Sequence, residues 1–326
     1  MAVSDVLSGR NLTLALPDAL NVFPKATPQQ KGGGADLSYG TLRFYGEANA
    51  YLTQVLEKPL SNVDINSLLL VAIYQLLHDQ ADDFTVVNQA VKAAGNAKPR
   101  WAKGLVNGVL RNYQRQAAEL EGAVAVQDVA RYAHPAWLIE RLKSDWPRDW
   151  ERILMANNAR PPFSLRVNRQ RMTRAEYLEV LSVRSLEAVP LAHTVMGARL
   201  ETPVPVEMLP GFTEGYVSVQ DGAAQLAAGL LDLHPGQRVL DACAAPGGKT
   251  AHILESEPEL ARVTAVDIDP RRLSRIGENL SRLSLHAGLV QGDAGAPSAW
   301  WDGMDYDRIL LDVPCSAIGV IRRHPD

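Results

Sequence analysis

Residues 240–250 are Leu240-Asp241-Ala242-Cys243-Ala244-Ala245-Pro246-Gly247-Gly248-Lys249-Thr250, and this stretch decides the fold of the chain. It continues a short apolar run, Arg238-Val239-Leu240, and it is followed by Ala251-His252-Ile253-Leu254, which has the spacing of a helix's first turns. We predict a strand that runs into a glycine turn and opens a helix. Two adjacent glycines let the backbone approach a ligand, and a helix start offers free amide donors. The stretch therefore predicts a nucleotide-type binding turn.

Three classes of ligand compete for such a turn. A Walker phosphate loop needs Gly-x-x-x-x-Gly-Lys-Thr, but Cys243 stands at its leading glycine, and Pro246 removes an amide donor from the loop. No Gly-x-Gly-x-x-Gly dinucleotide fingerprint is present. S-adenosylmethionine remains, since its uncharged ribose and amino-acid tail need backbone proximity more than phosphate donors. The next strand, Arg262 to Asp267, supports it by ending in an acid about 20 residues after the glycines, where a ribose diol would be held. The alternative is an ordinary strand-turn-helix corner.

Composition limits the class of protein. The chain has 326 residues with 46% hydrophobic content, enough for several cores and for two or three domains. No apolar run approaches the roughly 18 residues of a membrane span, and the start, Met1-Ala2-Val3-Ser4-Asp5, does not resemble a secretion signal. The two cysteines, Cys243 and Cys315, stand in separate motifs, so we predict neither a disulfide framework nor a metal site. We expect a monomeric, cytoplasmic protein without membrane contact.

Charge is distributed unevenly, although the net charge is only −4. Two stretches contain bases and no acids, one between Asp83 and Glu119 and one between Glu151 and Glu176. Such segregation favours binding of a polyanion such as RNA, while the alternative is that each stretch is a solvated helix face or loop. The bases are Lys92, Lys98, Arg100, Lys103, Arg111 and Arg115 in the first stretch, and Arg152, Arg160, Arg166, Arg169, Arg171 and Arg174 in the second.

The pattern of apolar residues predicts several domains. Residues 1–125 form a helical bundle, with helices at 37–56, 64–78, 85–94 and 101–116, a glycine loop at 32–34 and a break at 95–99. A helical linker follows at 126–160, with a helical piece at 134–158, and residues 161–220 form a small α+β module. Residues 221–326 alternate strands and helices, which is typical of a parallel doubly wound, Rossmann-like sheet.

The sheet has four predicted strands, near residues 239, 262–267, 289–290 and 308–311. Because this sheet type normally carries six or seven strands, we expect the domain to be incomplete at Asp326. The amino end is also expected to be trimmed.

A second chemical motif is Asp307-Arg308-Ile309-Leu310-Leu311-Asp312-Val313-Pro314-Cys315-Ser316, a buried strand that ends in an acid and a thiol. The pair suits a pyrimidine, because carbon 5 of cytosine becomes nucleophilic only after a thiolate adds at carbon 6. Asp312 can hydrogen-bond the nitrogen edge of the ring, and Cys315 is the nucleophile or a helper. The alternative for Cys315 is a small buried hydrophobe. A third acid, Asp293, ends the third strand and could meet an adenine amino group, although an Asp after Gly is often a turn residue.

These motifs closely resemble the RsmB (Sun/Fmu) family of 16S ribosomal RNA cytosine-5 methyltransferases. The resemblance includes Gln291-Gly292-Asp293 and, after the Asp-x-Pro-Cys motif, Gly319-Val320-Ile321-Arg322-Arg323-His324-Pro325-Asp326. Lys103-Gly104-Leu105-Val106-Asn107-Gly108-Val109-Leu110-Arg111 is similar to the signature helix of NusB-type RNA-binding domains, and Pro161-Pro162-Phe163-Ser164-Leu165-Arg166-Val167-Asn168 is similar to the family's RNA-contacting module. The resemblance covers nearly the whole chain.

The resemblance implies methyl transfer from S-adenosylmethionine to carbon 5 of a cytidine in 16S ribosomal RNA, with cytosine 967 as the family target. It implies that residues Cys243 to Lys249 surround the methionine moiety, Asp267 the ribose and Asp293 the adenine, with Asp312 between cofactor and base. The expected cofactor contacts within the turn are Cys243, Ala244, Ala245, Pro246, Gly247, Gly248 and Lys249, and the expected RNA contacts are Lys103, Arg111, Arg166, Arg169, Arg322 and Arg323.

The cysteines depart from the family pattern. In the family the thiol of the Asp-x-Pro-Cys motif assists product release, and a later Thr-Cys-Ser motif, absent from this sequence, supplies the attacking thiol. Either the chain is a shortened piece of a longer enzyme, which we expect, or Cys315 attacks by itself, as the equivalent thiol does in DNA cytosine methyltransferases. Two rival hypotheses are a chain that only binds RNA or cofactor, and a small-molecule methyltransferase, against which the two RNA-type modules argue.

Overall fold

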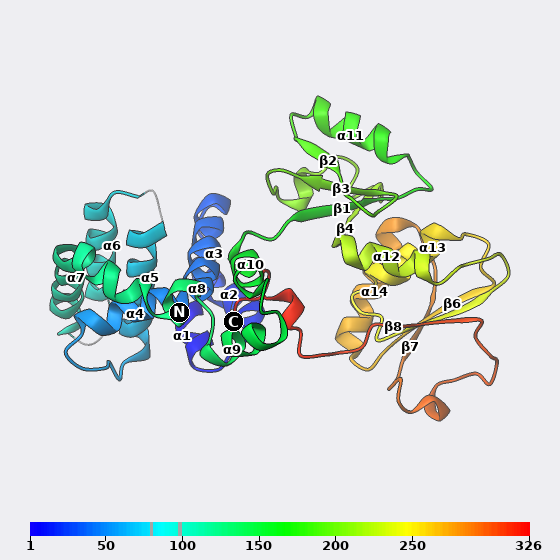
Figure 1. Cartoon of the computed structure of the whole chain (residues 1–326). Helices are drawn as coiled ribbons and strands as arrows, with labels where there is room; N and C mark the ends of the chain where they lie inside the picture. Colours follow the sequence, from blue (N-terminus) through cyan, green and yellow to red (C-terminus); the bar gives the residue numbers. More distant parts are fainter. Residues whose placement is uncertain (79–80, 97–99) are drawn as a thin grey trace. The chain divides into compact units, whose positions relative to one another are not determined.

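The computed structural model describes residues 1–78, 81–96 and 100–326, which divide into two compact units (Figure 1). One unit contains Met1–Arg160 and Ala317–Asp326, and the other contains Pro161–Ser316. The predicted break at 95–99 lies partly outside the described residues, as does Lys98.

The first unit is a helical bundle around one large hydrophobic core. Leu69, Leu70 and Ile73 of one helix and Val106 and Leu110 of another are fully buried in this core. The helices are α1 (Ala2–Leu7), α2 (Leu12–Asn21), α3 (Pro28–Arg43), α4 (Tyr45–Val55), α5 (Val63–His78), α6 (Asp83–Gly95), α7 (Ala102–Ala125), α8 (Asp128–Tyr132), α9 (Ala136–Asp145) and α10 (Trp150–Asn158).

Two details of the predicted bundle are wrong. The glycines at 32–34 do not form a loop but lie inside α3, because Thr27 and Gln30 form a capping box and Pro28 starts the helix. The helix predicted over 37–56 is two helices, since the backbone leaves the helical path at Phe44 (φ −104°).

Residues 317–326 belong to the helical unit, although they were predicted as part of the Rossmann-like domain. They contain the short 3₁₀ turn η3 (Ile318–Val320). The backbone N–H of Leu12 donates to Oδ2 of Asp326 at 2.7 Å, and Nη2 of Arg43 donates to the carbonyl of Arg322 at 2.6 Å. These side-chain and backbone contacts attach the segment to α2 and α3.

The second unit contains two sheets. The first is antiparallel with order β2-β3-β1-β4, and α11 (Arg174–Val183) packs on it through Tyr177 and Leu181. Its strands are β1 (Phe163–Val167), β2 (Ala188–Pro190), β3 (Gly197–Leu200) and β4 (Val217–Val219), and the 3₁₀ turn η1 (Val206–Met208) lies between β3 and β4. This antiparallel sheet with its helix is the predicted α+β module.

The second sheet is parallel, with order β7-β6-β5-β8, which confirms the predicted doubly wound alternation. Strand β5 lies between β6 and β8, with Leu240 opposite Thr264 on one side and Ile309 on the other. Ligands of open parallel sheets bind beyond the carboxyl ends of such central strands, where the strand order reverses. The elements are α12 (Gly222–Leu230), β5 (Arg238–Ala242), α13 (Gly248–Ser256), β6 (Arg262–Asp267), α14 (Pro270–Leu283), β7 (Gly288–Gln291), the 3₁₀ turn η2 (Pro297–Ala299) and β8 (Arg308–Leu311).

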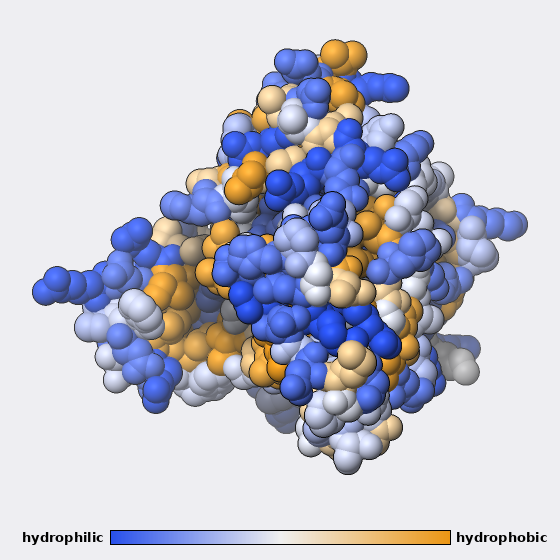
Figure 2. All heavy atoms as spheres, turned by 90° about the vertical axis from the view of Figure 1, so that its right-hand side faces the viewer, coloured by the Kyte–Doolittle hydropathy of each residue, from blue (hydrophilic) through white to orange (hydrophobic). Residues whose placement is uncertain are grey.

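Strand β8 stands at the edge of the parallel sheet. Its Ile309 is 52% exposed and Leu311 65%, and Val313, just after the strand, is 55% exposed. Hydrophobic residues also lie among the hydrophilic ones on the face shown in Figure 2. The prediction of a buried strand before the Asp-x-Pro-Cys motif is therefore wrong, because the residues of β8 are exposed or only partly buried.

Candidate active site

The turn between β5 and α13 requires glycine at Gly247. Its φ is 93°, and a Cβ added there would lie 2.9 Å from the side chain of Ile276 and 3.1 Å from its Cα. Cys243, at the start of the turn, also has a positive φ, 60°. The backbone is thus folded tightly enough for a ligand to approach α13 at its first residue, Gly248.

Asp267, at the end of β6, holds this turn in place. Its Oδ2 accepts the backbone N–H of Ala245 at 3.1 Å, and its Oδ1 accepts that of Asp269 at 3.1 Å. Nη2 of Arg272 lies 3.7 Å from the same carboxylate and donates to the carbonyl of Ala245 at 3.2 Å. Because Asp267 is only 2% exposed, the structure gives it a role in shaping the turn that the sequence had not suggested.

Asp241 is a second buried acid in the motif, and no role was predicted for it. Its Oδ2 accepts the hydroxyl of Thr250 at 2.6 Å, while its Oδ1 is buried with no partner among the described residues. Burial raises the pKa of Asp241 to about 6, although the Thr250 hydrogen bond and Lys249 act in the opposite direction. The hydrogen bond between Asp241 and Thr250, nine positions apart, joins the end of β5 to the first turn of α13. An acid at the end of the strand and a hydroxyl at the start of the helix could have predicted this pair from the sequence.

The structure brings together the two predicted motifs. Lys249, the second residue of α13, forms an ion pair with Asp312, which follows β8. Cys315, three residues further on, is exposed, whereas Cys243 is partly covered. Burial raises the pKa of the Cys243 thiol, and the charge of Asp267 adds to this effect, so Cys243 is held as a thiol rather than a thiolate. Asp293 is exposed after β7, and its Oδ1 accepts the N–H of Gly295 at 2.8 Å.

The predicted RNA contacts have different environments. Lys103 and Arg111 are exposed on α7, and Arg169 is exposed just after β1. Arg322 is partly covered, and its guanidinium donates to the carbonyls of Ala159 and Arg160, at 3.4 and 2.6 Å. Arg323 lies next to it and is also half-buried.

The prediction for Arg166 is wrong. Its side chain is 1% exposed and forms an ion pair with Glu255 at 2.8 Å, so it cannot reach an RNA phosphate. The local sequence indicates the opposite, because an arginine between the apolar Leu165 and Val167 is expected on the solvent face of a strand, whereas residues 164–167 of β1 are all buried.

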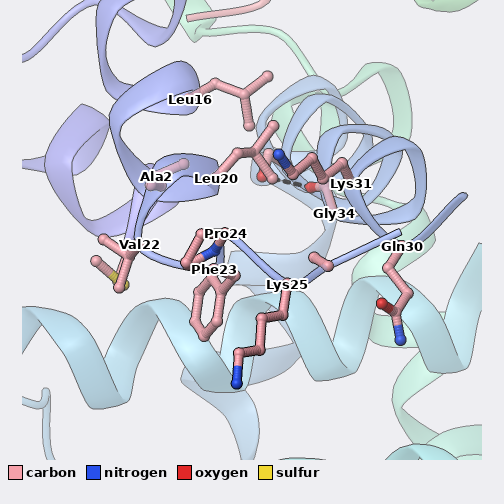
Figure 3. A pocket seen from close by; sticks show the side chains of 14 residues that line it. Ala2, Leu16, Leu20, Val22, Phe23, Pro24, Lys25, Gln30, Lys31 and Gly34 are labelled. Carbon is pink, nitrogen blue, oxygen red and sulfur yellow. Dashed lines mark hydrogen bonds between the residues drawn. The ribbon is translucent and has the colours of Figure 1, made fainter. Parts of the chain in front are cut away.

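A separate hydrophobic cavity of about 840 Å³ lies in the helical unit. Leu16, Leu20, Val22 and Phe23 line it, as Figure 3 shows. It contains none of the predicted site residues.

The described residues contain neither a membrane-spanning helix nor a cluster of metal-binding side chains. Within residues 1–78, 81–96 and 100–326, no helix is both long and apolar enough to cross a membrane. The same part of the chain has no cluster of three or more His, Cys, Asp or Glu side chains placed to bind a metal ion.

Comparison with known families divides the chain into three matches. Residues 7–115 match the NusB family, residues 134–207 match the ferredoxin-like domain of RsmF/B-like methyltransferases, and residues 228–326 match the family described as 16S rRNA methyltransferase RsmB/F. The predicted family resemblance and the three predicted kinds of domain are therefore confirmed.

Curated relatives match over the full length of the chain. Ribosomal RNA small subunit methyltransferase B of Pseudomonas syringae pv. tomato is 48% identical, over 100% of this chain and 72% of the relative. The protein of the same name from Vibrio cholerae is 45% identical, over 98% of this chain and 73% of the relative.

Two solved structures share the fold. The crystal structure of PH0851 aligns with 99% of this chain and 74% of its own, with a TM-score of 0.77 and 23% identity. A methyltransferase homolog protein from Pyrococcus horikoshii aligns with 60% of this chain and 64% of its own, with a TM-score of 0.53 and 27% identity.

Proposed function

The chain belongs to the ribosomal RNA small subunit methyltransferase B family, and we propose that it transfers a methyl group from S-adenosylmethionine to carbon 5 of a cytidine in 16S ribosomal RNA. The proposed target is cytosine 967. The observation that carries the proposal is the ion pair between Lys249 and Asp312, which joins the cofactor turn to the Asp-x-Pro-Cys motif in one site.

The residues of the turn fit S-adenosylmethionine. Gly247 allows the left-handed backbone that the turn needs, and α13 begins at Gly248 with free amide groups in its first turn. Carboxylates stand beyond the ends of neighbouring parallel strands, as a ribose and an adenine amino group require. The segment from Cys243 to Lys249 would hold the methionine moiety, Asp267 the ribose and Asp293 the adenine.

The bound cofactor supplies an electrophilic methyl group, and the chain's own residues prepare the base. A cysteine thiolate adds to carbon 6 of cytosine, forming a C–S bond and making carbon 5 nucleophilic. Asp312 hydrogen-bonds the nitrogen edge of the ring and shares a proton with it as the thiolate adds. Carbon 5 would take the methyl group as its bond to the sulfonium breaks and S-adenosylhomocysteine is released, after which carbon 5 loses its proton to a base and the thiolate leaves carbon 6.

Of the two thiols in this chain, that of Cys315 is suited to the base side of the site. It is exposed three residues after Asp312, whereas the Cys243 thiol is partly covered and has a raised pKa. By analogy with the family, Cys315 assists release of the product. It can supply the attacking thiolate as well if the chain is active by itself.

The proposal is tested by incubating the purified chain with methyl-labelled S-adenosylmethionine and unmodified 16S RNA, then digesting the RNA to nucleosides. Label in 5-methylcytidine is the expected result, and RNA in which cytosine 967 is replaced by uridine should stay unlabelled. If label appears, loss of transfer in Cys315→Ser identifies Cys315 as the attacking thiol, whereas transfer that persists leaves Cys243, the other cysteine of the sequence, to attack. RNA binding without any label would favour the rival hypothesis of a chain that only binds RNA.

A further inference from the structure

Arg166 connects the α+β module to the parallel-sheet part of the same unit. It lies on β1, yet its Nε donates to Oε2 of Glu255 at 2.9 Å and its Nη2 to Oε1 at 2.8 Å. Glu255 is in the last turn of α13, 89 positions later, and is 2% exposed. A buried charge is tolerated only when it is paired and fully hydrogen-bonded, and this two-point geometry pairs both groups.

Nη1 of Arg166 reaches Gly248, the residue at which the turn after β5 enters α13. This nitrogen donates to the carbonyl of Gly248 at 2.9 Å and also to Oε1 of Gln220. That carbonyl belongs to the peptide group between Gly248 and Lys249. Arg166 thus fixes the peptide group that precedes the side chain paired with Asp312.

A neighbour of Arg166 holds the other end of the same helix. Nε2 of Gln170 donates to the carbonyls of Leu254 and Glu255 at 2.8 and 3.2 Å. These carbonyls lie in the last turn of α13, where intrahelical partners are missing. The α+β module therefore holds α13 at both its first and its last turn.

A second arginine attaches the module without contacting the turn. Arg282, near the end of α14, donates to the carbonyls of Phe212 and Val217 at 2.6 and 3.1 Å, and its guanidinium lies 4.2 Å from the centre of the Phe212 ring. Arg166 and Arg282 both attach the α+β module, but of these two arginines Arg166 alone donates a hydrogen bond to Gly248. Substitutions at the two positions can therefore distinguish attachment of the module from positioning of Gly248.

We propose that Arg166 is a positioning residue for methyl transfer, which fixes the Gly248–Lys249 peptide group and thereby sets where Lys249 meets Asp312. The inference rests on the proposed function and adds a role for the α+β module in cofactor binding. A cofactor displaced by a fraction of an ångström loses much of its reactivity. The hydrogen bonds of Arg166 to Gly248 and Glu255 are therefore expected to affect cofactor affinity and turnover.

The test compares three variants of the full chain. Arg166→Met combined with Glu255→Met removes both charges and leaves neither buried alone, Arg166→Lys keeps the charge but loses the fork of donors, and Arg282→Met is the matched control at the same interface. Calorimetry measures the Kd of S-adenosylmethionine, kinetics measure kcat and the KM of each substrate, and thermal melts report folding.

We expect the double variant to weaken cofactor binding about tenfold and Arg166→Lys to weaken it about threefold, with the KM of RNA within about twofold of wild type. Arg282→Met should leave cofactor affinity within about twofold. The inference is overturned if the double variant binds the cofactor like wild type, or if Arg282→Met weakens binding equally. Should the double variant fail to fold, Arg166→Lys decides by the same criterion. Failure of the wild-type chain to bind S-adenosylmethionine would instead overturn the proposed function, and this inference with it.

Discussion

The ammonium group of Lys249 and the carboxylate of Asp312 form an ion pair although 63 positions separate them in the chain. The side chain of Lys249 is 22% exposed and that of Asp312 57%. An ion pair this open to solvent contributes little to stability. Its importance is geometric, because it joins the segment after β8 to the first turn of α13.

Asp312→Asn keeps the size of the side chain and removes its charge and its capacity to accept a proton. We expect methyl transfer to slow by about 100-fold or more, while the free energy of unfolding changes by less than about 1 kcal/mol. Single-turnover kinetics and urea unfolding measure the two effects. Asp232→Asn is the control, since Asp232 is an exposed acid that itself lies outside both motifs, although it pairs with Arg308 of the second motif at 3.5 Å. A rate within twofold of wild type would argue against a role of Asp312 in catalysis.

Gly247→Ala should damage the turn, whereas Gly248→Ala should be tolerated by the fold. The added methyl group at Gly247 meets Ile276 at 2.9 Å in a left-handed backbone, but the nearest atom to a methyl group at Gly248 is 3.8 Å away. We predict a loss of about 1–3 kcal/mol in the free energy of unfolding for Gly247→Ala and less than about 1 kcal/mol for Gly248→Ala. Chemical denaturation measures both. Equal stability of the two variants would contradict the geometry of the turn.

Arg169→Gln tests the prediction that Arg169 contacts RNA. Arg169 is exposed, so loss of its charge should reduce the slope of log K against log salt concentration for RNA binding by about 1. Arg184→Gln is a matched control, because Arg184 is exposed at the end of α11 in the same module. The combined Arg166 and Glu255 variant should leave the slope unchanged. A slope that Arg169→Gln does not alter would remove Arg169 from the RNA surface.

Asp241→Asn should change the pH dependence of stability. The folded chain raises the pKa of Asp241 from 3.8 to about 6, so protonated Asp241 stabilises the fold at low pH and this contribution is lost as the pH rises through 6. Relative to Asp241→Asn, the wild-type chain should therefore lose about 2 kcal/mol of unfolding free energy between pH 4.5 and 7.5. Urea unfolding at both pH values measures the difference. A constant offset between the two proteins would show that Asp241 titrates normally.

The local pattern of apolar residues and turns predicted the strands of the parallel sheet, but it did not predict contacts between residues far apart in the sequence. The strands at 262–267 and 308–311 have the predicted bounds because each is a short apolar run between turn signals. The glycines at 32–34 were predicted as a loop from their own propensity, but the capping box of Thr27 and Gln30 and the packing of α3 against α5 outweigh it. Arg166 was assigned to RNA because its partner, Glu255, is 89 positions away, and no local pattern identifies such a pair.

The contacts of Leu12 with Asp326 and of Arg43 with Arg322 make the helical unit discontinuous in sequence. The unit of residues 161–316 is inserted between its two parts. During synthesis from the amino end, residues 161–316 are therefore translated before the segment 317–326 that joins the helical unit. A fragment ending at Arg160 would contain every helix from α1 to α10 and still lack the acceptors that Asp326 and Arg322 provide, so these contacts of α2 and α3 form only after residues 161–316 have been translated.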